Sequence, residues 1–159
     1  MSRWSNRRQK FRKMLETQHC VYPASVYDPI SARIAENIGY EMGMYAGSLA
    51  SLAVLAAPDL ILLTQTEYAQ QAHRIGRASE LPLFADADHG YGNALNVKRT
   101  VEELENAGLA GLSIEDTDLP QPFGSDGKAT LLSIDEGVGK MRAAVAGRSD
   151  PNLVIAGRT

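Results

Sequence analysis

The sequence predicts an α/β fold built on a parallel sheet, and three observations lead to that expectation. Short apolar runs alternate with amphipathic segments along most of the chain. Capping residues open the amphipathic segments, and glycines close several of them. Four strand–helix units and one further strand follow in that order, which requires parallel strands joined by helical crossovers. An open doubly wound sheet and a (β/α)8 barrel both satisfy this pattern, and both collect ligands at the carboxyl ends of their strands.

The chain begins with a basic segment that we expect to form a helix over about residues 3–17, docked on the surface of the domain. Its lysines and arginines all precede the first acid, Glu16. Trp4, Phe11 and Leu15 fall at helical spacing and give this helix one apolar stripe. No apolar segment with a small-residue cleavage site follows, which argues against a secretory signal.

The first strand–helix unit starts with an expected strand over residues 20–25. Asp28 is then expected to be a helix N-cap and Pro29 the first residue of that helix. Gly39 is expected to end the helix. Between them the apolar residues repeat every four positions, as in a helix. These residues are Ile30, Ile34 and Ile38.

The second and third units have the same plan. A strand is expected over about residues 42–48, and after an alanine-rich stretch Thr64 and Glu67 have the spacing of a capping box. The helix that follows contains Tyr68, Ala72 and Ile75. The third strand is expected over residues 81–88, and its helix ends at Gly108. The apolar face of that helix comprises Val97, Val101 and Leu104.

The fourth strand is expected over residues 109–116, and a long loop follows it. Ser133 and Glu136 have the spacing of another capping box, which opens a helix with an apolar register. Its apolar members are Ile134, Val138, Met141 and Val145. A fifth strand over residues 153–159 ends the sequence.

Side-chain alternation places the acids of two neighbouring strands on one face. Asp86 and Asp88 share a face of the third strand, and Glu115 shares the matching face of the fourth with Ser113. Strands lie about 4.8 Å apart, so three carboxylates converge, and such a cluster needs protons, hydrogen bonds or a cation. Oxygen ligands favour Mg²⁺ or Mn²⁺. An equally open interpretation is that Asp88 and Glu115 only cap the following helix or loop.

His89 follows the acids directly, and its type fits a general base, a ligand or a hydrogen-bonded structural residue. The adjoining Gly90 and Gly92 match neither phosphate-binding glycine pattern and instead allow a tight turn. Arg158, at the end of the fifth strand, has the chemistry to grip a substrate carboxylate or to form a salt bridge to the acids. Ser48, at the end of the second strand, either presents its hydroxyl to the same anion or lies in a plain turn.

Composition limits the class of partner and the compartment. The formal net charge of −3 gives no electrostatic reason to expect nucleic acid. No apolar run approaches the roughly 20 residues that span a membrane. Cys20 is the single cysteine, so an intrachain disulfide is excluded and a cytoplasmic protein is expected.

Several long motifs together resemble the isocitrate lyase/phosphoenolpyruvate mutase superfamily, and within it most closely the oxaloacetate decarboxylase branch. They are AGSLASL, APDLILLT, LFADADHGYGNALNVKRTVEELENAG, LSIEDTDLPQPFG and EGVGKMRAA. The resemblance covers nearly the whole chain. It implies a (β/α)8 TIM barrel, truncated here after about the fifth strand, so that residues 1–159 are the N-terminal part of one barrel domain.

The resemblance also implies a site. Mg²⁺ would be held directly by Asp86, and through water by Asp59, Asp88 and Glu115. Ser48 with Gly47 would bind the substrate, and Arg158 would grip its carboxylate. The family implies a homotetramer with a swapped C-terminal helix.

The branch of the family decides the expected reaction. The lyases carry a K-x-C-G-H motif after the fourth strand, whereas this chain reads TDLPQPFGSDGKATLL there, without the cysteine. We therefore expect Mg²⁺-dependent decarboxylation of oxaloacetate to pyruvate and CO₂, by Asp86 and Arg158 and without a covalent nucleophile. Phosphonopyruvate hydrolase or phosphoenolpyruvate mutase-like activity on a 2-oxo acid, and an inactive half-barrel fragment, are the alternatives.

Overall fold

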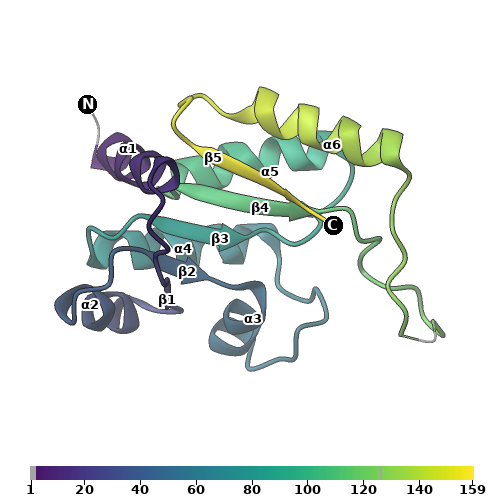
Figure 1. Ribbon diagram of the computed structural model, residues 1–159. Coiled ribbons are helices and arrows are strands. Elements are labelled where there is room, and N and C mark those ends of the chain that lie inside the picture. The colour runs from purple at the N-terminus through teal and green to yellow at the C-terminus, as the bar shows by residue number, and fades with distance from the viewer. Residues whose placement is uncertain (1–2, 126) are drawn as a thin grey trace.

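The computed structural model describes residues 3–125 and 127–159 and shows five parallel strands that alternate with helices (Figure 1). The strands are β1 (Ala24–Ser25), β2 (Gly43–Tyr45), β3 (Leu83–Asp86), β4 (Gly111–Glu115) and β5 (Val154–Arg158). The helices are α1 (Arg3–Glu16), α2 (Pro29–Asn37), α3 (Gly47–Leu55), α4 (Gln65–Ala78), α5 (Ala94–Asn106) and α6 (Ile134–Gly147). The order of the strands in the sheet is their order in the chain. The expected α/β fold with a parallel sheet is confirmed.

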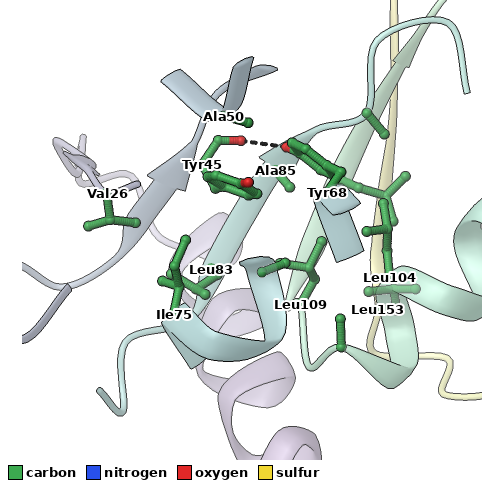
Figure 2. Packing of buried hydrophobic residues seen from close by; sticks show 14 of the residues in the cluster. Val26, Tyr45, Ala50, Tyr68, Ile75, Leu83, Ala85, Leu104, Leu109 and Leu153 are labelled. Atoms are coloured by element: carbon green, nitrogen blue, oxygen red, sulfur yellow. Dashed lines mark hydrogen bonds between the residues drawn. The ribbon is translucent and has the colours of Figure 1, made fainter. Parts of the chain in front are cut away.

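The main core lies between the sheet and the row of helices α2, α4, α5 and α6, each of which packs on the next (Figure 2). In Figure 2, Leu83 of β3 lies beside Ile75 of α4, and Leu104 of α5 lies near Leu153, all of them fully buried. Burial of each such side chain contributes about 1.5–3 kcal/mol relative to its exposed state. The rings of Tyr45 and Tyr68 stack with centroids 4.5 Å apart, and Tyr68 Oη donates to the Tyr45 carbonyl at 2.8 Å.

Helix α1 lies at the amino-end side of the sheet, away from the long loop after β4 (Figure 1). Phe11 contacts Phe84 near the start of β3, with ring centroids 5.7 Å apart. Trp4 packs over Gly108, whose φ of +98° ends α5. The predicted basic helix is therefore confirmed, although its stripe is shorter than expected because Leu15 is 57% exposed.

The arginines of α1 are a structural feature that sequence periodicity did not reveal. Arg7 and Arg8 are buried. Arg7 Nη1 donates to the Gly76 carbonyl at 2.7 Å, near the end of α4. Arg8 Nε donates to the Leu109 carbonyl at 2.9 Å, and Arg8 Nη2 donates to the Glu105 carbonyl near the end of α5 at 2.6 Å. Carbonyls at helix ends lack intrahelical partners and carry partial negative charge, so these guanidinium groups stabilise both helix ends.

Local capping explains where most helices begin. Asp28 and Thr64 form the predicted caps of α2 and α4, each in a reciprocal capping box. Asn93 caps α5. At α6, Ser133 Oγ accepts a hydrogen bond from the Glu136 N–H at 3.2 Å, which is the first of the two bonds of the expected box. These side chains satisfy N–H groups that have no partner within a helix.

The expected first two strands are too long. The first is reduced to two residues, β1. The second ends at Tyr45, and helix α3 begins at Gly47, so the expectation that Ser48 ends a strand is wrong. The physical reason is that the stretch after Ser48 is rich in alanine and leucine, which are strong helix formers.

Two apolar stripes named from helical periodicity face solvent. Ile30, Ile34 and Ile38 are 69%, 53% and 70% exposed, whereas Ala32 and Ala35 provide the buried face of α2. In α6, Ile134, Val138 and Val145 are exposed, whereas Met141, the fourth member of the predicted stripe, packs against the core. Among the described residues, no helix combines the length and apolar character needed to cross a membrane.

Candidate metal and substrate site

The predicted acids gather at the carboxyl ends of β3 and β4. Asp86 lies opposite Ser113 in the register of these strands, and Ser113 Oγ donates to Asp86 Oδ1 at 3.3 Å. The Asp88 N–H donates to the same oxygen at 3.1 Å, which holds Asp88 beside Asp86 although β3 has already ended. Leu83 and Ala85 point into the core. The predicted alternation along the third strand is therefore confirmed.

Arg158 joins the acids of two strands. It lies opposite Glu115 in the pairing of β4 with β5. Its Nη1 donates to Asp86 Oδ2 at 2.7 Å, its Nε donates to Glu115 Oε2 at 2.8 Å, and its Nη2 contacts that same glutamate oxygen. Burial works to lower the pKa of Arg158, but hydrogen bonds to Glu115 and Asp86 outweigh it and raise the pKa, so the guanidinium stays charged. The salt bridge to the acidic cluster, one of the two expected roles of Arg158, is present.

Asp88 is the carboxylate with the most unfavourable surroundings. Burial, followed by repulsion from Asp86, Asp59 and Glu115, raises its pKa to about 7 against the opposing effect of Arg158. Its carboxylate packs against the start of α3, where a Cβ on Gly47 would lie 2.9 Å from Asp88 Oδ1. A glycine at position 47 is therefore required for this approach.

Neither aspartate of the DADHGYGN stretch caps the next helix. The cap of α5 is Asn93, and the cap of α6 is Ser133, not Glu115. Asp88 and Tyr91 instead adopt left-handed backbone angles, with φ of +47° and +62°, so that the chain turns sharply beside the acids. The interpretation of Asp88 and Glu115 as caps of these helices is wrong.

The remaining expected residues lie around this cluster. Ser48 is exposed in the first turn of α3. The N-cap position of this helix is Ala46, and no side-chain cap bond is present there among the described residues. Asp59 is exposed on the loop after α3, close enough to contribute to the raised pKa of Asp88.

His89 is buried in the protein, where Glu115 and Asp118 are near enough to oppose part of the lowering of its pKa. It is 6% exposed, and its Nδ1 is buried without a hydrogen-bond partner among the described residues. Burial and the nearby Lys140 lower its pKa, so His89 is neutral at neutral pH. Its ring lies 5.9 Å from that of Tyr91. This environment favours the structural interpretation of His89 over that of a metal ligand.

Three residues of the site escaped sequence reasoning as functional candidates. Ser113 binds Asp86, and its position two residues before Glu115 on the same strand face was the available signal. Tyr91 lies near the acids, and burial and Asp88 raise its pKa. Lys140 is buried on α6 near His89 and Glu115, and burial lowers its pKa. Tyr91 follows Asp88 by three residues, so its place in the sequence was the available signal, whereas only the tertiary fold brings Lys140 to the cluster.

The donor set suits a hard cation that is held mainly by water. Carboxylate and hydroxyl oxygens are the ligands that Mg²⁺ prefers, and Mg²⁺ usually keeps several waters. Among residues 3–125 and 127–159, no group of three or more His, Cys, Asp or Glu side chains is placed so that it could hold a metal ion. Burial is the main cause of the raised pKa of Asp88, and repulsion from the neighbouring acids, which Arg158 opposes, adds to it. The residues therefore fit a cation with few direct protein ligands.

The sequence of this chain is similar to those of proteins in a known family. Residues 11–159 match the phosphoenolpyruvate phosphomutase family model. The chain is 62% identical to an oxaloacetate decarboxylase of Bradyrhizobium diazoefficiens, over 97% of this chain and 53% of that protein. It is 59% identical to an oxaloacetate decarboxylase of Rhodopseudomonas palustris (strain BisB18), over 98% of this chain and 54% of that protein. The chain thus spans about half the length of these curated relatives.

Solved structures of related enzymes superpose on this chain. An oxaloacetate acetylhydrolase in complex with 3,3-difluorooxalacetate superposes with a TM-score of 0.88 at 32% identity, over 98% of this chain and 54% of that chain. The phosphoenolpyruvate phosphomutase of Streptomyces platensis subsp. rosaceus superposes with a TM-score of 0.87 at 33% identity, over 95% and 53%. A phosphonopyruvate hydrolase complex with oxalate and Mg²⁺ superposes with a TM-score of 0.85 at 30% identity, over 99% and 52%. The five strands of this chain match about half of each structure.

Proposed function

Because the chain belongs to the phosphoenolpyruvate phosphomutase family, we propose that it serves the Mg²⁺-dependent decarboxylation of oxaloacetate to pyruvate and CO₂. One observation carries the proposal. Asp86, Glu115 and Arg158 meet at the strand ends of a chain that is 62% identical to an oxaloacetate decarboxylase. In α/β sheets and barrels, this is the edge at which ligands bind.

In this proposal Asp86 holds Mg²⁺, or Mn²⁺, directly, and three acids hold its waters. These three are Asp59, Asp88 and Glu115. The oxygen donor set and the uncompensated charge around Asp88 support the assignment. A bound divalent cation supplies Lewis-acid stabilisation of negative charge that develops on the 2-oxo oxygen of the substrate.

The residues of the chain bind and orient the substrate. Arg158 has a planar fork of N–H donors that fits a carboxylate, and its present bonds to Asp86 and Glu115 place that fork at the site. The uncapped N–H groups of Gly47 and Ser48 have the chemistry to receive a carboxylate oxygen. Held at both ends, the substrate is oriented so that the C–C bond to the departing carboxylate aligns with the carbonyl π system.

Bond cleavage requires no nucleophile from the protein. The electron pair of the breaking bond moves toward the 2-oxo oxygen, CO₂ leaves, and the resulting enolate takes up a proton at C3 to give pyruvate. The proposed step assigns no role to His89, which is buried.

Two alternatives follow from particular observations. The similarity to a phosphonopyruvate hydrolase and to a phosphoenolpyruvate phosphomutase favours phosphonopyruvate as a second substrate to test. The coverage of about half of each relative favours an inactive half-barrel as the outcome for the chain alone. By analogy with the family, we also propose a homotetrameric assembly, which light scattering of the active protein tests. We further propose a cytoplasmic location, because the exposed Cys20 is unpaired.

The test measures pyruvate released from oxaloacetate, with the background of free Mg²⁺ subtracted. This chain, its Asp86→Asn variant and the full-length Bradyrhizobium relative are assayed in parallel, with phosphonopyruvate as the competing substrate. Asp135→Asn, at an exposed position in the first turn of α6, is the matched control. We expect oxaloacetate turnover that Asp86→Asn abolishes and Asp135→Asn preserves. Turnover in the relative alone identifies this chain as an inactive half-barrel, and faster turnover of phosphonopyruvate contradicts the assigned substrate.

A further inference from the structure

A groove runs between α4 and α5 on the faces that these helices turn away from the core. Its volume is about 500 Å³, within the range of roughly 300–1,000 Å³ that is typical of small-molecule sites. Gln70, Arg74 and Arg77 line one wall at helical spacing, and Arg99 and Asn106 line the other. None of these residues belongs to the proposed substrate site.

The groove carries positive charge on an acidic chain. Three arginines and one carboxylate, that of Glu103, are among its described lining residues, whereas the net charge of the chain is −3. Arg99 Nε lies 3.6 Å from Glu103 Oε1, but the two side chains are 68% and 45% exposed, so solvent weakens their attraction. Arg74 Nη1 donates to Gln71 Oε1 at 3.3 Å, which uses one of the five N–H donors of its guanidinium. The groove therefore has more guanidinium groups than carboxylates among its described lining residues.

The walls of the groove are held rigidly. Tyr68 and Ile75 anchor α4 in the core, and Val101 and Leu104 anchor α5. Side chains that project from two packed and capped helices keep their spacing, so little ordering is needed when a ligand binds. His73, also in the groove, makes an edge-on contact with Trp4, with ring centroids 6.3 Å apart.

We propose that this groove binds a small polyanion, a compact molecule with two or more phosphate or carboxylate groups. Guanidinium groups on both walls present N–H pairs that match the oxygens of either group, and the amides of Gln70 and Asn106 add neutral donors. The proposed anion site is separate from the proposed substrate site, because none of its lining residues belongs to the acidic cluster.

Isothermal titration with pyrophosphate and with citrate, both without divalent metal, tests the proposal. The variant Arg74→Gln/Arg99→Gln removes one guanidinium from each wall. The control Lys13→Gln/Arg33→Gln removes the same charge from exposed positions on α1 and α2. Loss of each charge-assisted contact weakens binding by about tenfold or more, so the groove variant loses at least that factor and the control changes by less than about twofold. Added salt should weaken anion binding to the wild-type protein, since the guanidinium groups of Arg74 and Arg99 are exposed to solvent.

The position of the anion decides the result. Amide NMR shifts on titration are expected along residues 65–77 and 99–107, and they persist in Arg158→Gln, which alters only the proposed substrate site. Binding of citrate alone identifies a carboxylate site, and binding of pyrophosphate alone identifies a phosphate site. The proposal is overturned if neither binds, if the groove and control variants bind equally, or if the shifts centre on Arg158.

Discussion

Arginine–carboxylate clusters occupy both ends of the sheet, but they have different surroundings. At the amino end, Arg8 is buried and bonds two backbone carbonyls in addition to Asp150 Oδ2 at 3.1 Å. At the carboxyl end, the Arg158 side chain is 46% exposed and contacts only carboxylates, those of Asp86 and Glu115, among the described residues. The first guanidinium is immobilised by the fold, whereas the second can exchange its partners for a ligand. We infer that an arginine with helix-end carbonyls as partners stabilises the structure, and that one held only by acids is available for binding.

The largest effect is expected at the amino end. Arg8→Ala leaves Glu105 and Asp150 without their cation and removes the guanidinium donors to the Leu109 and Glu105 carbonyls. Removing one partner of a buried ion pair costs about 3–5 kcal/mol, so the free energy of unfolding falls by that amount in urea titrations. Lys10→Ala, at an exposed position on the same helix, changes it by less than about 0.5 kcal/mol. A loss below about 1 kcal/mol for Arg8→Ala would remove the distinction between the two clusters.

The opposite pattern is expected at the carboxyl end. Arg158→Gln breaks ion pairs that are partly exposed, so the free energy of unfolding changes by less than about 1 kcal/mol. In an active form of the protein, turnover of oxaloacetate falls by about 100-fold, because the substrate carboxylate loses a bidentate partner. Steady-state kinetics beside urea titration separates the two effects. Unchanged turnover with a large loss of stability would assign Arg158 a structural role.

Two glycines with almost the same backbone angle measure how tightly α1 is packed. Gly108 has a φ of +98°, and an added Cβ would meet the Trp4 ring at 2.6 Å. Gly39 has a φ of +96° and open space around the same position. Gly39→Ala therefore costs about 1–2 kcal/mol for its left-handed backbone alone. Gly108→Ala costs a further 1–3 kcal/mol or so from overpacking. If both variants lose the same free energy of unfolding in thermal or urea titrations, α1 moves to accommodate the added methyl group and is not tightly packed.

The smallest effect is a dependence on pH at the amino end. Burial works to raise the pKa of Asp150, but hydrogen bonds from Asn152 and Arg8 outweigh it and lower the pKa. A carboxyl whose folded pKa lies below its unfolded pKa adds stability above the unfolded value, about 3.9, and loses it as the pH falls. The difference in unfolding free energy between the wild-type protein and Asp150→Asn should therefore shrink from neutral pH toward about pH 3. A difference that grows on acidification would reverse the assigned sign.

Much of the fold could be predicted because its signals are local. Thr64 and Glu67 cap α4 through atoms three residues apart, and strand alternation alone places Asp86 on the open face. Ser48 could not be placed, because the sequence does not show where the second strand ends and the next helix begins. In the structure, β2 ends at Tyr45 and α3 begins at Gly47. The partners of Arg8 are more than 90 residues away in the chain, and no local pattern encodes them. The exposure of the isoleucine stripe of α2 likewise depends on what packs there, which periodicity does not specify.

Calorimetric titration of Mg²⁺ into the wild-type protein and into Asp86→Asn tests the central claim most directly, since it measures the carboxyl-end cluster without relying on turnover. We expect the wild-type protein to bind Mg²⁺, and Asp86→Asn to bind it at least about tenfold more weakly, because a neutral amide replaces the direct ligand. Lys10→Gln, at an exposed position on α1, should bind Mg²⁺ as the wild-type protein does. Equal Mg²⁺ affinity in the wild-type protein and Asp86→Asn would contradict the claim that the carboxyl-end acids form the metal site.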